Sequence, residues 1–304
     1  MNKVAFLFAG QGSQYVGMGK DLYDNFPEAR VIFERAEAVA GFDLKKRCFD
    51  GPEEALKSTN ISQPAIVTVS IAAFEVFKKK SDIKPDYMAG LSLGEYSALI
   101  ASSSLTFEDG IRLIKRRGEL MEEAAQKYPG KMAAVLGLDA QKVKEICLNS
   151  GAEVANLNCP GQIVITGEKK PVEKAGDLCV QAGAKRVIPL EVSGGFHSSL
   201  MFEASVELKK VLENTPMIEP VAPVISNYTA SPEQKVVEIM NNLVFQIRSS
   251  VRWEDSMRYM LSQGVDKFYE FGPGKVLKGL ARKIDPGIEV ISIEKKSDLE
   301  AAWA

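Results

Sequence analysis

A Gly-Leu-Ser-Leu-Gly pentapeptide at residues 90–94 is the feature that most restricts how this chain can fold. An apolar stretch precedes it and a helical pattern begins at Glu95. Side chains in place of Gly90 or Gly94 would clash in so tight a strand-to-helix turn. The layout is typical of a nucleophile elbow, which exposes Ser92 where a helix begins. The alternative is a glycine-rich turn that merely contains a serine.

The bulk composition is that of an ordinary globular chain. Its 304 residues can bury the core of a large domain, and 45% hydrophobic with 26% charged residues is a usual balance. A net charge of −2 lacks the basic excess that nucleic-acid binding requires. No run approaches the roughly 18 apolar residues of a membrane-spanning helix. We therefore expect no nucleic-acid or membrane partner, and a cytoplasmic location.

Cysteine and histidine usage is evidence against a metal centre. No two cysteines have Cys-x-x-Cys spacing, and the chain has one histidine to join them. We expect reduced thiols and no metal or other cofactor. Tyr15 stands where a dinucleotide fingerprint needs glycine, and Tyr269 where a phosphate loop needs it. The cysteines are Cys48, Cys147, Cys159 and Cys179.

The order of apolar and helical patterns predicts an α/β fold. Strand-like runs alternate with helices in the first half, beginning with the apolar residues 4–8. Thr106 and Asp109 form a capping box for a helix over 107–127. A further helix is predicted over 64–80, and a strand near 224–227.

The pattern changes between Tyr128 and Gly195, where the elements follow the order β-α-β-β-α-β of a ferredoxin-like fold. We therefore predict a large domain of residues 1–127 and 196–304 with a mostly parallel sheet, and an inserted ferredoxin-like subdomain of residues 128–195. The predicted strands of the insert are 131–138, 153–157, 162–166 and 185–192, and its helices are 141–150 and 171–181.

His197 is the only histidine. A serine hydroxyl is a weak nucleophile and needs an adjacent base, most often histidine. His197 follows a Ser193-Gly194-Gly195 hinge, and it follows Ser92 in the chain as in elbow enzymes. Spacing alone leaves open whether it is a base or a histidine with a structural hydrogen bond. If His197 is the base, we expect the reaction rate to fall on acidification between about pH 8 and 5, as the imidazole becomes protonated.

Two further features have both a functional and a structural interpretation. Arg117 has only apolar neighbours at helical spacing, so it needs an anion, either a structural carboxylate or the carboxylate of a substrate. The loop Gly10-Gln11-Gly12-Ser13-Gln14 follows the first strand. It is an ordinary turn or a source of N–H groups for an oxyanion, together with the N–H of Leu93.

Taken together, these motifs resemble the malonyl-CoA:acyl carrier protein transacylases, the acyltransferases of type II fatty acid synthesis. The resemblance covers nearly the whole chain with every motif in order, and its fold is an α/β-hydrolase-like large domain with a ferredoxin-like insert. It rests on Gln11 in the glycine-rich loop, Gln63-Pro64, Ser92 followed by Glu95-Tyr96, Arg117-Gly118, Asn158 before Pro-Gly-Gln, His197 before Ser-Ser-Leu-Met, and Phe271-Gly272-Pro273-Gly274.

The resemblance implies a ping-pong transfer through an acyl-serine. Ser92 would attack malonyl-CoA, and His197 would act as base, protonate the departing CoA thiolate and later activate the carrier thiol. Arg117 would hold the malonyl carboxylate. A backbone carbonyl of Gln246 would orient His197, so no aspartate is required.

The remaining implied roles concern substrate binding and partners. Backbone N–H groups of Gln11 and Leu93 would form the oxyanion hole, and Gln63 would line the pocket. The implied partners are acyl carrier protein and CoA, and a monomer is expected. Leu91 replaces the histidine that many relatives carry before the nucleophile, which makes the pocket wall more apolar. Phe196 resembles the malonyl-selective form of related polyketide domains.

Two rival interpretations remain at this point: a serine esterase or thioesterase, and a non-catalytic carrier-docking protein. A docking patch for the acidic carrier is available on a basic helix face with i, i+3, i+7 spacing, although such a face is also compatible with simple solvation. It consists of Lys275, Lys278 and Arg282.

Overall fold

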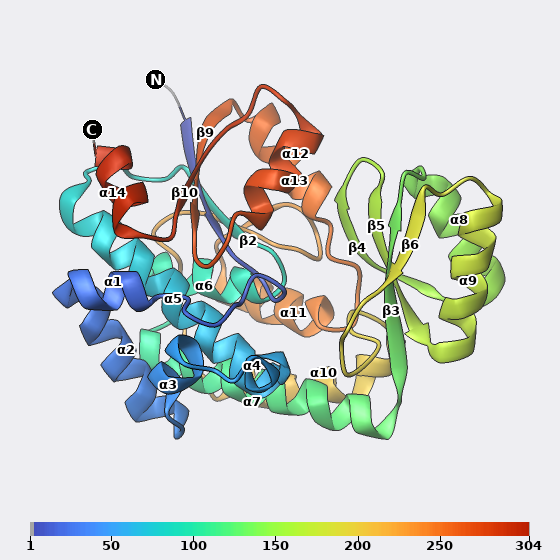
Figure 1. Ribbon diagram of the computed structural model, residues 1–304, viewed down its shortest axis with the longest axis horizontal. Coiled ribbons are helices and arrows are strands. Elements are labelled where there is room, and N and C mark those ends of the chain that lie inside the picture. Colours follow the sequence, from blue (N-terminus) through green and yellow to red (C-terminus); the bar gives the residue numbers. More distant parts are fainter. Residues whose placement is uncertain (1–2, 304) are drawn as a thin grey trace.

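The larger part of the molecule is built on a six-stranded sheet in the computed structural model, which describes residues 3–303 (Figure 1). Its strands are β1 (Lys3–Phe8), β2 (Tyr87–Gly90), β7 (Val224–Ile225), β8 (Pro232–Glu233), β9 (Val265–Phe271) and β10 (Glu289–Ile293). They lie in the order β10-β9-β1-β2-β7-β8, and all neighbours are parallel except β7 and β8. The predicted mostly parallel sheet is confirmed.

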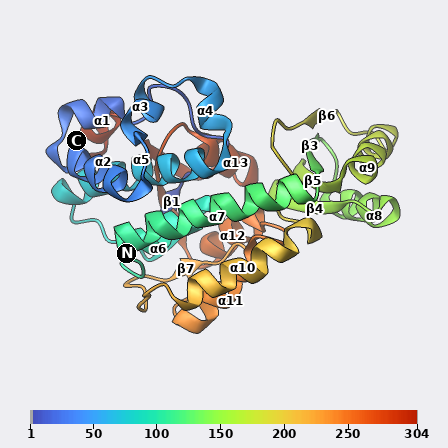
Figure 2. The ribbon, with the colours of Figure 1, turned by 90° about the horizontal axis from the view of Figure 1, so that it is seen from below.

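Helices cover this sheet and form most of the surrounding core. They are α1 (Lys20–Asn25), α2 (Pro27–Ala40), α3 (Leu44–Phe49), α4 (Glu53–Lys57), α5 (Thr59–Lys80), α6 (Leu93–Ala101), α7 (Phe107–Lys127), α10 (Phe202–Glu213), α11 (Val236–Gln246), α12 (Trp253–Ser262), α13 (Val276–Ile284) and α14 (Lys296–Trp303), with a 3-10 turn at Ser199–Met201. Figure 2 shows α7 running from beside α6 to the smaller sheet. The helix predicted over 107–127 is confirmed, and the Thr106 hydroxyl accepts the N–H of Asp109 as its cap.

Helix α5 starts earlier than the sequence analysis predicted. The sequence predicted a helix over 64–80. The structure begins it at Thr59 and accommodates Pro64 inside the helix. By length and composition α5 could cross a membrane, but 83% of its most apolar window is buried within the protein. Such burial is typical of a helix in the core of a globular protein.

A second, antiparallel sheet forms the smaller part of the molecule, to the right in Figure 1. Its elements follow the predicted order: β3 (Gly130–Leu136), α8 (Ala140–Ser150), β4 (Glu153–Cys159), β5 (Gln162–Glu168), α9 (Lys169–Gln181) and β6 (Arg186–Pro189). The strands lie in the order β4-β5-β3-β6, with α8 and α9 packed on the outer face. The last strand is shorter than predicted, because the chain leaves the sheet after Pro189 to border the cleft between the two sheets.

Backbone hydrogen bonds join the smaller sheet to the segment between α11 and α12 of the larger part. The N–H of Leu157 in β4 donates to the carbonyl of Val251, and the N–H of Val251 donates to the carbonyl of Ala155. The backbone of the smaller sheet also packs closely against the Gly195 backbone. A Cβ atom on Gly130 would lie only 2.5 Å from the backbone nitrogen of Gly195. The smaller sheet is therefore held directly beside the residues that precede His197.

Candidate active site

Ser92 lies in the sharp turn between β2 and α6. Its φ of 52° and ψ of −98° are strained for a residue with a side chain. The flanking glycines are required sterically, because a Cβ on Gly90 would lie 2.0 Å from the Gly94 carbonyl carbon, and a Cβ on Gly94 2.2 Å from the Phe8 oxygen. The predicted strand–turn–helix layout is confirmed, with α6 beginning at Leu93 rather than at Glu95.

The single histidine contacts this serine. Oγ of Ser92 lies 2.8 Å from Nε2 of His197, and Nδ1 of His197 lies 2.8 Å from the carbonyl oxygen of Gln246. A carbonyl only accepts hydrogen bonds, so Nδ1 carries the proton and Nε2 is free to accept from the serine hydroxyl. His197 also has a positive φ, 56°, so both residues of the pair occupy strained backbone.

The surroundings of His197 keep its imidazole neutral. Burial, and then the positive charge of Arg117, lower the pKa of His197 to about 4, while the hydrogen bond to Gln246 opposes the shift. An imidazole with this pKa is unprotonated at neutral pH, as a general base must be. The sequence-based expectation of a titration between pH 8 and 5 is therefore too high for the free protein.

Arg117 of α7 is fully buried beside the pair. Its Nη2 lies 3.1 Å from Oγ of Ser92 and 3.1 Å from Oε1 of Gln246, and its Nη1 lies 3.0 Å from Oε1 of Gln63. The guanidinium carbon lies 5.2 Å from the ring centroid of Tyr96. All three hydrogen-bond acceptors are neutral, and the buried carboxylate of Glu95 attracts Arg117 without a hydrogen bond to it.

The other predicted binding residues lie in the same cluster. Gln63, buried in α5, donates through Nε2 to Oε1 of Gln11 at 3.2 Å, which links the glycine-rich loop to Arg117. A Cβ on Gly10 would lie 2.3 Å from the Leu91 oxygen, so this loop packs directly on the serine turn. Leu93 is the first residue of α6, and its N–H therefore has no acceptor within that helix.

A cleft of about 410 Å³ leads to these residues. One wall comes from the larger part of the molecule and the other from β3, β4, β5 and the segment after β6. Apolar side chains line most of the cleft, and a few amide side chains lie among them. This composition suits a small organic ligand that has a few polar groups. The lining includes Ser92, Leu91, Met121, Met132, Asn156, Asn158, Gln162, Val192, Phe196, His197, Val276 and Leu280.

The sequence analysis missed a buried polar network behind the serine. Asn227 accepts the N–H of Ser92 through Oδ1 at 2.5 Å and donates to the Gly90 carbonyl at 2.8 Å. Glu95 is completely buried and accepts from the N–H of Asn227 and from Nε2 of Gln246, both at 2.9 Å. Glu95 could have been singled out as a carboxylate in an apolar helix, whereas no local signal marks Asn227.

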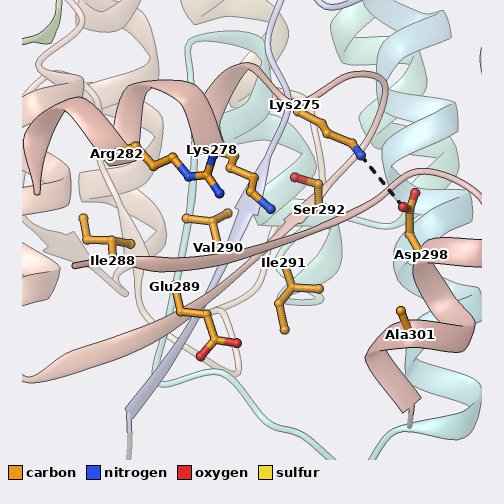
Figure 3. Close-up of a pocket in the computed structure, with 10 residues that line it drawn as sticks. All are labelled: Lys275, Lys278, Arg282, Ile288, Glu289, Val290, Ile291, Ser292, Asp298 and Ala301. Atoms are coloured by element: carbon orange, nitrogen blue, oxygen red, sulfur yellow. Dashed lines mark ion pairs between the residues drawn. The ribbon is translucent and has the colours of Figure 1, made fainter. Parts of the chain in front are cut away.

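The basic residues considered as either a candidate docking patch or a solvated helix face lie apart from the serine. Lys275, Lys278 and Arg282 line a cavity of about 430 Å³ beside β10 and α14, and Nζ of Lys275 lies 4.0 Å from Asp298 (Figure 3). Val276 and Leu280 of the same helix border the cleft that contains Ser92. Helix α13 therefore borders both regions, with its basic residues on one and its apolar residues on the other.

No group of three or more potential metal ligands is found among residues 3–303. All four cysteines are buried without disulfide bonds. Burial raises the pKa of Cys48 and of Cys147 to about 12, so these two thiols are not ionised at neutral pH.

Comparisons of sequence with known proteins agree on a family. A family model described as the acyl transferase domain matches residues 5–283. The chain is 45% identical to the malonyl CoA-acyl carrier protein transacylase of Bacillus subtilis (strain 168), over 99% of this chain and 96% of the relative. It is 41% identical to the protein of the same name from Staphylococcus aureus (strain MRSA252), over 99% and 98% of the two chains.

Solved structures give the same result. An acyl carrier protein S-malonyltransferase from Vibrio cholerae superposes with a TM-score of 0.95 at 40% identity, covering 99% of this chain and 100% of the other. A malonyl-transacylase in complex with its type II polyketide synthase acyl-carrier protein has a TM-score of 0.97 at 39% identity, covering 99% of both chains. The mixed α/β architecture is shared with both.

Proposed function

This chain belongs to the acyl transferase domain family, and we propose that it transfers a malonyl group from malonyl-CoA to the thiol of acyl carrier protein in fatty acid synthesis. It is a transferase. The observation that carries the proposal is the meeting of three groups: Oγ of Ser92 lies 2.8 Å from Nε2 of His197 and 3.1 Å from Nη2 of Arg117. A nucleophile, a neutral base and a buried cation are what a reaction on a carboxylated thioester requires.

In the first half-reaction, His197 removes the proton of Ser92 as Oγ attacks the thioester carbon. A C–O bond forms, the C–S bond breaks, and the proton held on Nε2 passes to the departing CoA thiolate. The Gln246 carbonyl holds the Nδ1 proton throughout and stabilises the transient imidazolium. The depressed pKa of His197 supports this role, because the proton that it accepts is readily given up.

Arg117 binds the free carboxylate of the malonyl group. Its guanidinium already contacts Ser92, so a carboxylate two bonds from the reacting carbon is within reach. A buried arginine whose hydrogen-bond partners are all neutral gains a hydrogen-bonded ion pair when that anion enters. The ion pair therefore favours carboxylated acyl groups, such as malonyl, over acyl groups without a carboxylate, such as acetyl.

The tetrahedral intermediate needs donors for its oxyanion. The N–H of Leu93 at the start of α6 and the N–H of Gln11 in the adjacent loop are the proposed pair. The close approach of Gly10 to Leu91 supports this assignment, because it holds the loop against the serine turn.

In the second half-reaction, the carrier thiol gives its proton to Nε2 of His197 and its sulfur attacks the ester carbon. A C–S bond forms, the C–O bond to Ser92 breaks, and the proton passes from Nε2 to Oγ. Water competes for the same ester, so the acyl group must be shielded. Burial supports this shielding, since Ser92 is 8% exposed and Arg117 is fully buried. A carboxylate fixed by Arg117 also holds the ester in one orientation.

The acidic carrier docks on Lys275, Lys278 and Arg282, whose helix also borders the cleft.

We also propose that the smaller antiparallel sheet belongs to a ferredoxin-like subdomain and that the larger part is an α/β-hydrolase-like domain. The chain passes from one to the other at 127/128 and returns at 195/196. The β-α-β-β-α-β order supports the first description. Cytoplasmic location, a monomeric state and the absence of a cofactor stay predictions from the sequence.

Mass spectrometry of the intact protein after incubation with malonyl-CoA tests the function directly. We expect a malonyl adduct that maps to Ser92 on digestion, is absent in Ser92→Ala, and disappears when carrier protein with a free phosphopantetheine thiol is added. CoA release at the same rate with or without carrier would instead identify a hydrolase. A non-catalytic docking protein predicts no adduct at all.

A further inference from the structure

Glu95 is a charged residue in an unusually buried position. All nine residues of α6 are buried, and the Glu95 side chain is fully inaccessible. Placing a carboxyl group in such surroundings is costly unless it makes hydrogen bonds that other parts of the structure need. Its contacts therefore indicate what the residue does.

Both hydrogen bonds of Glu95 are accepted by a single oxygen. Oε2 receives the backbone N–H of Asn227 and the side-chain Nε2 of Gln246, each at 2.9 Å. These donors come from segments that lie more than a hundred residues further along the chain. One carboxyl oxygen thus ties α6 to two distant segments at once.

The two tethered residues are those that hold the reacting pair. The side chain of Asn227 binds the N–H of Ser92, and Nε2 of Gln246 also donates to the carbonyl of Ser92 at 2.9 Å. The backbone carbonyl of Gln246 orients His197. The Glu95 side chain has no hydrogen bond to Oγ of Ser92 or to His197, yet it binds both Asn227 and Gln246, which hold the backbone of Ser92 and the ring of His197.

Strain at the site explains why such a tether is needed. Ser92 and His197 both have positive φ, at a cost of roughly 1–3 kcal/mol each, and such conformations persist only when the surroundings over-determine them. Other charged groups lie near Glu95. Arg117 attracts it, Glu233 of β8 repels it, and none of its hydrogen bonds involves Arg117. Within residues 3–303, the only side-chain hydrogen bonds that Glu95 makes are therefore those to Asn227 and Gln246.

We propose that Glu95 is a positioning residue that holds Asn227 and Gln246 in place and thereby fixes Ser92 and the Nδ1–H tautomer of His197. The role in transfer rests on the proposed function, whereas the effect on the histidine does not. Because one oxygen accepts both bonds, a glutamine amide oxygen can replace it without a charge. A side chain of similar size that lacks an acceptor cannot.

Two variants separate hydrogen bonding from charge and from packing. Glu95→Gln keeps an acceptor, and Glu95→Met keeps approximate volume without one. We expect Glu95→Gln to retain kcat for malonyl transfer within about 3-fold. Glu95→Met should lose about 100-fold in kcat with KM within about 3-fold, since displacement of catalytic groups by about 1 Å has that effect. Equal losses in the two variants, or none in a folded Glu95→Met, would overturn the proposal.

The single histidine supplies a readout that needs no substrate. In protein labelled with ¹⁵N-histidine, the ring nitrogens of His197 should report a protonated Nδ1 and an unprotonated Nε2 near neutral pH, both unchanged in Glu95→Gln. In Glu95→Met we expect a mixture of tautomers. An unchanged spectrum would contradict the proposed role whether or not the protein transfers malonyl groups.

A matched control distinguishes positioning from general loss of stability. Glu270 is another buried carboxylate, which accepts the N–H groups of Leu277 and Lys278 and the hydroxyl of Ser292. Glu270→Met should lower the free energy of unfolding but leave the histidine spectrum unchanged, and a similar spectral change there would refute specificity. If Glu95→Met does not fold, Gln246→Leu removes the tethered amide, and an unaltered spectrum in that variant would equally overturn the proposal.

Discussion

The guanidinium of Arg117 lies 3.1 Å from Oγ of Ser92, so a buried cation stands directly beside the nucleophile. This single contact has two consequences. It provides a partner for a carboxylate on the acyl group bound to Ser92, and its charge helps to lower the pKa of His197. Substrate selection and the protonation state of the base therefore depend on the same side chain.

Replacing this arginine should alter the choice of substrate rather than abolish chemistry. For Arg117→Ala we expect kcat/KM for malonyl transfer to fall by at least about 100-fold, because a desolvated charge pair is lost. Acetyl transfer should be retained or increased, because an acetyl group has no carboxylate to pair. Steady-state rates with malonyl-CoA and acetyl-CoA measure both.

Arg116→Ala is the matched control, since Arg116 is the adjacent residue and forms half-exposed ion pairs with Glu119 and Glu123. It should change neither rate. Equal losses of malonyl and acetyl transfer in Arg117→Ala would contradict the binding role.

The pH dependence should reflect the buried state of the histidine. The folded pKa of about 4 lies below the ordinary value near 6.5, so His197 remains an unprotonated base as the pH falls through 6 and 5. We expect kcat/KM, which reports the free enzyme, to be limited by His197 only near pH 4.

An NMR titration of the one histidine tests this directly. The folded protein should show a midpoint near 4, and the chain unfolded in urea one near 6.5. A folded midpoint near 6.5, with an acid limb in the rate at the same pH, would show that Arg117 and burial do not act on His197 as described.

The glycines of the serine turn should tolerate no side chain. In Gly94→Ala the new Cβ would lie 2.2 Å from the Phe8 carbonyl oxygen, and β1 cannot move without breaking its sheet. We expect a loss of roughly 3 kcal/mol in the free energy of unfolding and loss of transfer activity. Urea denaturation measures the first.

Gly279→Ala provides the comparison within another helix. Gly279 lies in the interior of α13, and an added Cβ atom would meet no other atom within 4 Å, so alanine should stabilise the protein by roughly 0.5–1 kcal/mol. If both substitutions had the same effect, helix propensity rather than the close approach to Phe8 would be the cause.

Reversing the charge of the basic helix face should affect the carrier selectively. A Lys275→Glu, Lys278→Glu, Arg282→Glu variant should raise the KM for acyl carrier protein about 10-fold or more, with little change in the KM for malonyl-CoA. The wild-type carrier KM should also rise with salt, because exposed charge pairs are screened.

The control for this experiment carries the same charge change elsewhere. It replaces three exposed lysines on α8 and α9 by glutamate: Lys142, Lys144 and Lys174. Equal weakening in both variants would indicate a general effect of net charge, and no weakening in the first would place the carrier on another surface.

Local features of the fold could be predicted because their causes act over a few residues. The turn at Ser92 follows from the steric demands of Gly90 and Gly94, and the helix over 107–127 from its apolar periodicity and its Thr106 cap. The predicted start of α5 was wrong, because the helix begins at Thr59 and holds Pro64 in its interior. The residues before Pro64 are buried by packing against other segments, which no local pattern reveals.

The sequence by itself determined the strand–turn–helix around Ser92, the order of the elements in the smaller sheet, and a short set of chemically competent residues. Only the tertiary structure decided which of them meet. The contacts of Ser92 with His197, Asn227 and Gln246 span 105 to 154 residues, distances at which no local pattern acts and only packing sets geometry. The pKa of His197 likewise depends on burial and on Arg117, which are properties of the folded chain.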